Sequence, residues 1–472
     1  MSERSGVAAV ILAAGGGTRM KSGLPKVLHP AAGRPLLAHV LAALEPLDID
    51  ARYAVISNRV EKFESALADS HLRDPAEFVI QDPPRGTADA VKTALQVIGD
   101  RYKTILVLQG DSPLIQTSTL DALLHVHFDN SASATILTAR ISDPTGYGRV
   151  VRSRDGNVDR IGEERDATYE EREIDEINAG TYVFDVPALE QAIQEIQDTN
   201  IQGEFYLTDV VPALRAKGRT SLGYRTHPQE VLGVNSRAHL ARVAELLRRR
   251  ACDRLMDEGV TIVDPNTTYI DSSVQIAQDA TIHPFTFLEG RTVIGEGAEI
   301  GPQVRIVDSD IAESATISFA VVRESSIGPS ASVGPFASLR PGTRLERGAR
   351  LGSFVESKQT TLGENSKANH LSYLGDAQIG RGVNVGAGTI TCNWDGTEKH
   401  TTIIDDEAYI GSDTMLVAPT RVGKRAATGA GSVVRGEVPD EALAVGVPAR
   451  IIEGKGNKMR PRDGGEEAEP RQ

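Results

Sequence analysis

The sequence contains little of what marks a secreted, membrane-bound or nucleic-acid-binding protein. Only two cysteines occur in 472 residues, too few for a disulfide framework or a cysteine metal site. This scarcity favours a reducing compartment, so we expect a cytoplasmic protein. No apolar run approaches membrane-spanning length, and no membrane association is expected. The net charge of −14 argues against broad nucleic-acid binding, which requires a basic surface.

Aromatic residues are also scarce, whereas glycine is abundant. Phe, Trp and Tyr make up 4% of the chain, and 45 residues are glycine. This composition suits a repetitive architecture with many turns better than a single compact core. The length predicts two or three domains. The apolar run at residues 7–14 could pass for a signal-peptide core, but it is barely long enough, and we expect a strand instead.

The first stretch that indicates chemistry follows the apolar residues 7–12, which are typical of a buried parallel strand. Three glycines at residues 15–17 allow a sharp turn that presents backbone N–H groups to an anion. Arg19 and Lys26 add positive charge beside this turn. The dinucleotide-binding glycine pattern and the Gly-Lys-Ser/Thr of a P-loop are both missing. A glycine turn alone is commonly structural, but the paired cations favour a phosphate-binding turn.

Residues 6–230 alternate short apolar segments with helical patterns, which predicts a layered α/β sheet. Strands are expected at Val7–Leu12, Tyr53–Ile56, Glu77–Ile80, Thr104–Leu108, Thr135–Thr138 and Gly180–Phe184. Helices are expected at Pro35–Leu44, Ala88–Ile98, Ala188–Gln194 and Leu207–Ala216. Ligands of such sheets bind beyond the carboxyl ends of the strands.

Two short motifs fall at such positions. Asp111 directly follows an expected strand, where a carboxylate is a good magnesium ligand, although an isolated Asp there more often stabilises its own turn. Gly86 and Thr87 open a helix after Gln81, so their N–H groups could bind a base carbonyl or a phosphate. Capping alone would also explain Thr87.

The second half of the chain has a different period. Residues 235–258 predict one amphipathic helix, with Asn235 or Ser236 as its cap and Gly259 as its stop. Aliphatic residues then recur every six positions, which fits neither a helix nor a long strand but predicts a hexapeptide β-helix. The three registers run through Ile276, Ile282, Leu288, Ile294, Ile300 and Ile306, through Ile327, Val333, Leu339, Leu345 and Leu351, and through Ile404, Ile410, Leu416, Val422, Thr428 and Val434.

The six-residue register fails twice, between Leu351 and Ile379 and between Val385 and Ile404. Departures from a regular pattern are often functional. The first interval contains Lys358 and the polar stretch 367–376 with His370, and the second contains residues 389–396. A solitary His is most often a surface or capping residue, but this one lies in a polar, cation-rich segment.

Both halves resemble one enzyme family. Residues 12–26 are similar to the L-x-x-G-x-G-T-R-M…L-P-K signature of sugar-nucleotide pyrophosphorylases, and the repeats resemble left-handed β-helix acyltransferases. The two irregular intervals are similar, nearly residue for residue, to the acetyltransferase half of the bifunctional N-acetylglucosamine-1-phosphate uridyltransferase / glucosamine-1-phosphate acetyltransferase family. The resemblance implies acetylation of glucosamine 1-phosphate by acetyl-CoA. It then implies UMP transfer from UTP to N-acetylglucosamine 1-phosphate, giving UDP-N-acetylglucosamine and pyrophosphate.

The resemblance also implies an organisation of the chain. We expect an α/β nucleotidyltransferase domain with a Rossmann-like sheet at residues 1–234, a long helical linker at 235–258 and an all-β left-handed parallel β-helix at 259–453. A polar tail at 454–472 is expected to be disordered. The family is usually homotrimeric, with acetyltransferase sites between subunits.

Site residues are carried over from the resemblance position by position. For UMP transfer they are Arg19 and Lys26 at the triphosphate, Asp111 and Asn235 at Mg²⁺, Leu12, Ala13, Gly15, Gln81, Gly86 and Thr87 at the nucleotide, and Gly148, Glu163, Asn178 and Asn235 at the sugar nucleotide. For acetyl transfer they are His370 as the base, Arg340, Lys358, Tyr373 and Asn384 at the sugar phosphate, and Asn393, Trp394, Ser412, Ala430 and Arg450 at acetyl-CoA. Glu163 and Asn178 could otherwise be ordinary surface residues.

Two departures from the family pattern concern acetyl-CoA. Trp394 replaces a family Tyr, and residues 445–448 lack the family's Arg before Val-Pro, so that Arg450 is the candidate replacement. Two other interpretations stay open: a single-activity pyrophosphorylase for another sugar with an assembly or regulatory β-helix, and a scaffold whose β-helix only binds ligands. Both predict that His370 and Lys358 are dispensable.

Overall fold

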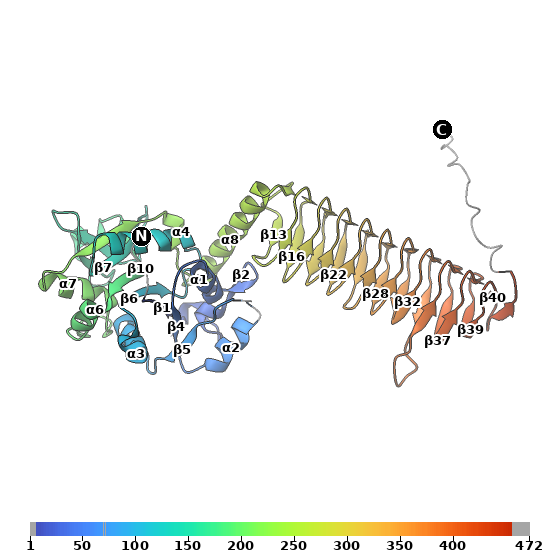
Figure 1. Cartoon of the computed structure of the whole chain (residues 1–472), viewed down its shortest axis with the longest axis horizontal. Helices are drawn as coiled ribbons and strands as arrows, with labels where there is room; N and C mark the ends of the chain where they lie inside the picture. Colours follow the sequence, from blue (N-terminus) through green and yellow to red (C-terminus); the bar gives the residue numbers. More distant parts are fainter. Residues whose placement is uncertain (1–5, 69, 71, 456–472) are drawn as a thin grey trace. The chain divides into compact units, whose positions relative to one another are not determined.

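The chain divides into two compact units, one extending to Leu247 and the other beginning at Arg248 (Figure 1). The computed structural model describes residues 6–68, 70 and 72–455. The division falls inside one long helix, α8 (Arg237–Asp257), which covers the predicted linker helix. Ser236, one of the two expected caps, accepts a hydrogen bond from His239 N at 3.2 Å. The predicted tail lies outside the described residues except for its first two positions.

A nine-stranded sheet forms the centre of the first unit, in the order β11-β7-β10-β6-β1-β4-β5, with β8 attached to β10 and β9 attached to β8. β1 pairs in parallel with both β4 and β6, while β10 runs antiparallel to β6 and β7. Every residue of β1 is buried, which explains its continuous apolar sequence. The strands are β1 Val7–Leu12, β4 Ala51–Ile56, β5 Glu77–Ile80, β6 Thr104–Gln109, β7 Ala134–Arg140, β8 Arg149–Arg152, β9 Val158–Gly162, β10 Glu176–Asp185 and β11 Ser221–Arg225, with a small hairpin of β2 Pro30–Ala31 and β3 Arg34–Pro35.

The six predicted strands are confirmed, and so are the predicted helices. The helices are α1 Leu36–Leu44, α2 Val60–Ala68, α3 Thr87–Ile98, α4 Thr117–Asp129, α5 Tyr169–Arg172, α6 Val186–Ile193 and α7 Val210–Ala216, the last preceded by a 3-10 turn at Leu207–Asp209. α2, α4 and α5 were not predicted. The signal for α4 is present, because its buried Leu120, Leu123, Leu124 and His127 follow helical spacing.

The second unit is a parallel β-helix, as predicted, with each strand paired to the strand one coil later (Figure 1). Three columns of strands result, which we call face 1, face 2 and face 3. Face 1 contains β12 Thr261–Ile262, β15 Thr281–Ile282, β18 Glu299–Ile300, β21 Thr316–Ile317, β24 Ser332–Val333, β27 Arg350–Ser353, β30 Lys367–His370, β33 Asn384–Val385, β36 Tyr409–Ile410, β38 Ala427–Thr428 and β40 Leu443–Val445, closed by the antiparallel β41 Arg450–Ile452.

The other two faces share one continuous sheet. Face 2 contains β13 Thr268–Ile270, β16 Thr286–Glu289, β19 Arg305–Val307, β22 Ala320–Arg323, β25 Ala337–Leu339, β28 Glu356–Lys358, β31 Tyr373–Gly375 and β34 Ile390–Cys392. Face 3 contains β14 Gln275–Ile276, β17 Val293–Ile294, β20 Asp310–Ile311, β23 Ser326–Ile327, β26 Arg344–Leu345, β29 Thr361–Leu362, β32 Ala377–Ile379 and β35 Thr402–Ile404. The longer β37 Met415–Val422 and β39 Val433–Val438 continue both faces.

The predicted failure of the six-residue register between Leu351 and Ile379 is confirmed as a shift in spacing, but it does not interrupt the coil. The strands from β27 to β32 follow one another without an interruption of the coil. Ser357 is a buried polar residue in the inward column and hydrogen-bonds Thr343 Oγ1 at 3.1 Å. The buried Leu362 then follows after five residues instead of six. A polar inward residue and a corner shortened by one residue therefore explain why the sequence pattern is irregular where the coil continues.

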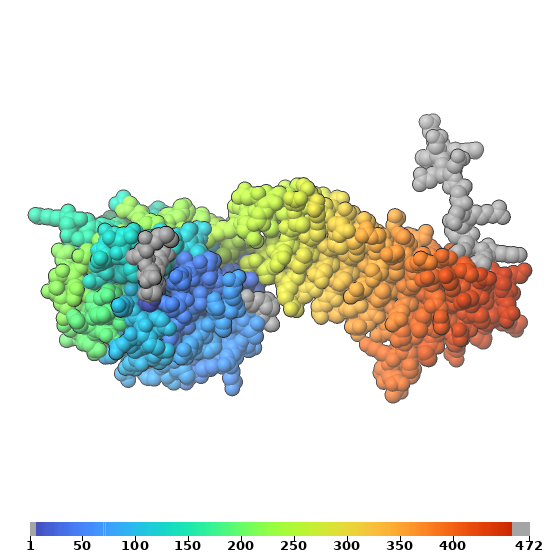
Figure 2. Space-filling view, in the orientation of Figure 1, coloured from blue at the N-terminus to red at the C-terminus, as the bar shows by residue number. Residues whose placement is uncertain are grey.

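The second predicted break is confirmed. Residues 393–401 leave the coil between β34 and β35 and form a loop that projects from the β-helix surface (Figures 1 and 2). Over the described residues, we find no helix with the length and apolar character needed to cross a bilayer.

Candidate active sites

A cavity of about 260 Å³ lies at the carboxyl ends of β1 and β6. Leu12 at the end of β1 pairs with Gln109 at the end of β6, so the turns that follow the two strands meet at one edge of the sheet. The lining includes eight predicted residues: Leu12, Ala13, Gly15, Lys26, Gln81, Gly86, Thr87 and Asp111. The sequence therefore identified most of this cavity, because the carboxyl ends of parallel strands gather in one place.

Lys26, Asp111 and Asn235 converge at this cavity. Lys26 Nζ donates to Asp111 Oδ2 in a very short ion pair and to Asn235 Oδ1 at 3.1 Å. The backbone N–H of Val234 donates to Asp111 O at 2.9 Å, which holds Asn235 at the end of β6. A carboxylate and an amide oxygen thus converge on one cation, and such hard oxygen donors fit Mg²⁺.

Gly17 lies directly against Lys26. Its φ is +56°, and a Cβ added there would lie 2.7 Å from Lys26 Cβ. Gly17→Ala should lower the free energy of unfolding by about 1–2 kcal/mol or more. The cause is the left-handed backbone, which disfavours a side chain, together with the overlap of the new Cβ with Lys26 Cβ. Thermal or denaturant unfolding would measure the change. Gly16→Ala is the matched control, because an added Cβ meets nothing within 4 Å there. Equal stability of the two variants would contradict the assigned geometry.

Gln81 and Thr87 have structural partners at the start of α3. Gln81 is 4% exposed, and its Nε2 donates to Gly86 O at 3.2 Å and to Asp89 Oδ2 at 2.7 Å. Thr87 Oγ1 accepts from Leu207 N at 3.0 Å and does not cap the helix, because the cap position belongs to Gly86. Capping, the alternative explanation of Thr87, is therefore wrong.

Gly148, Glu163 and Asn178 form a second group in the first unit. Asn178 N donates to Gly148 O at 2.9 Å, and a Cβ on Gly148 would lie 3.6 Å from Glu163 Oε2. Burial raises the pKa of Glu163, whose Oε1 accepts from Thr208 Oγ1 at 3.0 Å.

Gln109 connects this group to the cavity. It lines the cavity, and its Nε2 donates to Gly180 O at 3.3 Å. Gly180 N in turn donates to Asn178 Oδ1 at 3.0 Å. Sequence reasoning missed Gln109, although its place at a strand end beside Asp111 was a usable signal. Arg19 is exposed on the 3-10 helix Thr18–Met20 and does not line the cavity.

A cationic cluster lies on face 2 of the β-helix. Arg340 N donates to Ser357 O at 2.8 Å, which places Arg340 and Lys358 in adjacent coils. The neighbouring Lys399 lowers the pKa of Lys358, while the hydrogen bond from Arg340 to Glu356 raises the pKa of Arg340. Lys399 comes from the projecting loop and was not predicted. Three close cations make this cluster suited to a phosphate.

Tyr373 and Asn393 border the same cluster. Lys358 pairs with Gly375, and a Cβ on Gly375 would lie 2.5 Å from Tyr373 Oη and 2.7 Å from Asn393 Nδ2. The absence of a side chain at Gly375 leaves room for both polar groups beside its backbone. Asn393 Nδ2 also donates to Asp376 Oδ2 in a very short bond, a partner that the sequence did not indicate.

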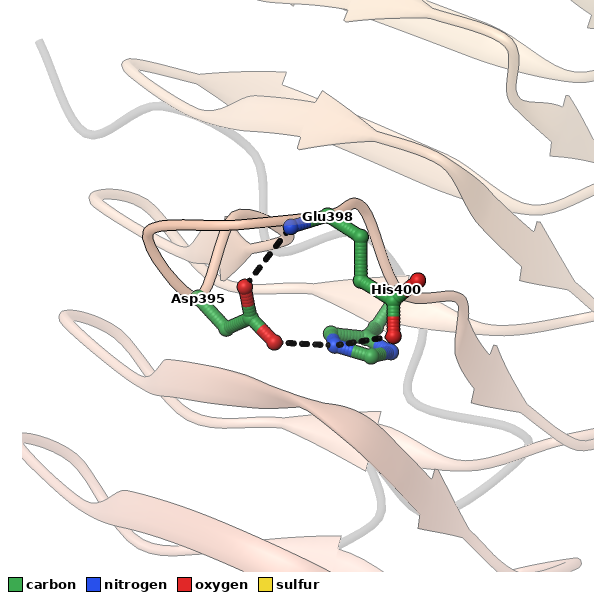
Figure 3. A group of neighbouring side chains, drawn as sticks. All are labelled: Asp395, Glu398 and His400. Atoms are coloured by element: carbon green, nitrogen blue, oxygen red, sulfur yellow. Dashed lines mark hydrogen bonds and ion pairs between the residues drawn. The ribbon is translucent and has the colours of Figure 1, made fainter.

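The projecting loop carries Trp394 and Lys399, which form an antiparallel bridge. Asp395 accepts from Glu398 N at 2.8 Å and lies 2.6 Å from His400 Nε2 (Figure 3). Hydrogen bonds from the Glu398 backbone, the His400 ring and the Thr397 backbone lower the pKa of Asp395 to about 2. These contacts fix the loop, so they position the exposed Trp394 ring and the Lys399 ammonium.

His370, Ser412 and Ala430 form a line along the corner between faces 1 and 2. Each lies three residues after one of the register-aligned positions Lys367, Tyr409 and Ala427. All three are exposed. Ala427 pairs with Leu443 in the next coil, and Gly446 lies three residues after Leu443. At Gly446 the resemblance to the family leads one to expect an Arg. Arg450 pairs with Val445 across the closing hairpin, so the structure brings it next to that position.

Asn384 is separated from the other predicted sugar-phosphate residues. It lies on face 1, paired with Lys367 and Tyr409, whereas Arg340, Lys358 and Tyr373 belong to face 2. One chain alone therefore does not bring all four residues together.

Comparisons with known proteins agree with this architecture. The sequence profile described as nucleotidyl transferase matches residues 8–227. A relative from Thermobifida fusca is 47% identical over 98% of this chain and 96% of its own. Relatives from Carboxydothermus hydrogenoformans and Exiguobacterium sibiricum are 46% and 45% identical, covering 92% and 93% of this chain and 96% of each relative. All three carry the name bifunctional protein GlmU, and on this similarity over nearly the full length the chain belongs to the GlmU family.

Proposed function

We propose that this bifunctional enzyme acetylates glucosamine 1-phosphate with acetyl-CoA and then transfers UMP from UTP to the resulting N-acetylglucosamine 1-phosphate. The products are CoA, UDP-N-acetylglucosamine and pyrophosphate. The observation that carries the proposal is the cationic cluster on face 2 of the β-helix, together with the exposed His370 at the corner between faces 1 and 2. A nucleotidyltransferase with a purely structural β-helix would need no such second site.

UMP transfer is assigned to the cavity at β1 and β6. A phosphate oxygen of the sugar phosphate attacks the α-phosphorus of UTP, and the bond to pyrophosphate breaks on the opposite side. The work of the protein is charge neutralisation and alignment. Lys26, Arg19 and the amides of residues 15–17 hold the triphosphate. Arg19 is exposed, and it would have to turn toward the bound phosphates to take part.

Asp111 and Asn235 are the proposed ligands of Mg²⁺. Their oxygens already converge on the ammonium of Lys26, which supports a shared cation position. When bound, Mg²⁺ neutralises charge on the phosphate oxygens. We assign Leu12, Ala13, Gln81, Gly86 and Thr87 to the nucleotide and the group of Gly148, Glu163 and Asn178 to the sugar.

Acetyl transfer is assigned to the β-helix. The amine of glucosamine 1-phosphate attacks the thioester carbon, and His370 accepts the amine proton. As the carbon–sulfur bond breaks, His370 returns that proton to the departing sulfur, so that CoA leaves as its thiol. Histidine suits this role because imidazoles as a class take up protons near neutral pH. Arg340, Lys358 and Lys399 pair with the sugar phosphate, and Tyr373 and Asn384 fix the ring.

Acetyl-CoA is assigned to the line of corner positions that begins at His370. Ser412 and Ala430 follow in the next coils, and Arg450 at the end of the line substitutes for the missing family Arg. Asn393 and Trp394 of the projecting loop contact the same cosubstrate. The exposed Trp394 ring can stack on it but cannot accept a hydrogen bond.

A homotrimer is the proposed assembly. Phe285, Phe336, Phe354 and Leu371 are each more than half exposed along one corner, and the rings of Phe336 and Phe354 stack with centroids 5.4 Å apart. A hollow of about 480 Å³ lies beside this apolar ladder. Exposed apolar surface of this kind favours an interface, and a site between copies would bring Asn384 of one chain to the face 2 cluster of another. Sedimentation equilibrium should give three chain masses; a monomer would contradict the assembly.

The two half-reactions test the function separately. Glucosamine 1-phosphate with acetyl-CoA should release CoA without UTP or Mg²⁺. N-acetylglucosamine 1-phosphate with UTP and Mg²⁺ should release pyrophosphate without acetyl-CoA. Pyrophosphate release alone would favour the single-activity interpretation, and neither product would favour a scaffold. We also propose a cytoplasmic location, which the scarcity of cysteine supports.

A further inference from the structure

We propose that Lys26 is the resident counter-ion of the metal site and that it exchanges places with the divalent cation. Its ammonium occupies the position between Asp111 and Asn235, and a metal ion must displace it from there. The displaced ammonium then serves the triphosphate. This inference rests on the proposed magnesium-dependent UMP transfer and adds a coupling between metal and nucleotide binding.

Electrostatic repulsion prevents the Lys26 ammonium and a divalent metal ion from binding the oxygens of Asp111 and Asn235 at the same time. Lys26 Nζ contacts Asp111 Oδ2 and lies 3.1 Å from Asn235 Oδ1, so a metal ion on the same oxygens would touch an ammonium that can only donate. The side chains of Lys26 and Asp111 are 16% and 15% exposed, so water screens this repulsion poorly. An unpaired carboxylate would be costly at this depth, so Asp111 needs a cationic partner, and Lys26 supplies it.

The surroundings give the displaced ammonium a place to go. Lys26 lines the same cavity as Gly15 and Gly16 of the glycine turn, so a rotation of its flexible stem carries the charge toward the proposed phosphates. The backbone segments that carry Asp111 and Asn235 have supports that do not depend on the Lys26 ammonium. Val234 N holds Asp111 O at 2.9 Å, and Arg237 Nη1 lies 3.4 Å from His29 Nδ1, which ties the start of α8 to the segment that follows Lys26.

Metal binding without nucleotide tests the exchange directly. Mn²⁺ titrated into the full-length, nucleotide-free protein and followed by electron paramagnetic resonance should bind Lys26→Met at least about tenfold more tightly than the wild type, because one competing charge is removed. Lys21→Met is the matched control. It removes an exposed charge from the same loop and should change the Mn²⁺ affinity less than about twofold.

The double variant Asp111→Asn/Lys26→Met should not show the tighter Mn²⁺ binding of Lys26→Met, because Lys26 and the metal ion compete for Asp111. Thermal unfolding and CoA release confirm that each variant is folded. Unchanged or weaker Mn²⁺ binding by folded Lys26→Met would overturn the exchange. This outcome is separable from failure of the proposed function, because the titration contains no UTP and pyrophosphate release by the wild type is measured independently.

Discussion

Replacing His370 with alanine should reduce CoA release from acetyl-CoA and glucosamine 1-phosphate by about 100- to 10,000-fold, the usual contribution of a general base. Pyrophosphate release from UTP and N-acetylglucosamine 1-phosphate should remain within about twofold, because His370 belongs to the second unit and the cavity at β1 and β6 to the first. Separate steady-state assays of the two products measure both effects in one preparation.

His283→Ala is the matched control for this variant. His283 is another histidine of the β-helix. It is half-buried, and its Nε2 lies 3.0 Å from Glu299 Oε1, away from the proposed sites. Its removal should leave CoA release within about twofold. Equal loss of both activities in a folded trimer of His370→Ala would contradict two independent sites, and full CoA release would remove His370 from the reaction.

Replacing Asp111 with asparagine should have the opposite selectivity. Pyrophosphate release should fall by about 100-fold or more, because the variant loses the only carboxylate of the proposed metal site, and losses of this size follow removal of one charge-stabilising group. CoA release should not change. The Mg²⁺ concentration needed for half-maximal pyrophosphate release should rise, and a magnesium titration of the rate measures it.

Asp100→Asn provides the control for a lost carboxylate. Asp100 is exposed in the same unit, so its replacement should leave both rates within about twofold. If Asp111→Asn kept full magnesium-dependent activity, Asp111 would not be a metal ligand, and the convergence with Lys26 and Asn235 would be structural.

The cavity of the first unit was largely predictable, and the physical reason is local. Asp111 and the glycine turn each follow a buried parallel strand, and parallel strands present their carboxyl ends on one edge. Asn235 could not be placed this way. It is 209 residues from Lys26, and tertiary contacts bring it to the cavity: Val234 N donates to Asp111 O, and Lys26 Nζ donates to Asn235 Oδ1. The resemblance to the family supplied what local pattern could not.

The β-helix shows where periodicity succeeds and fails. Inward aliphatic residues every six positions identified the fold, since each short strand sends one side chain into the core. At Ser357 the aliphatic pattern is interrupted although the coil continues. A buried hydroxyl with a hydrogen-bond partner takes the place of an inward aliphatic residue there. Lys399 and Asp376 were missed for another reason. Their approach to Lys358 and Asn393 depends on how one loop folds back, which no repeat encodes.

The most direct test of the whole account supplies glucosamine 1-phosphate, acetyl-CoA, UTP and Mg²⁺ together and identifies the sugar nucleotide by mass spectrometry. The account predicts UDP-N-acetylglucosamine, with CoA and pyrophosphate released in equal amounts. Pyrophosphate release with an unacetylated or different sugar nucleotide as the product, and no CoA, would contradict it.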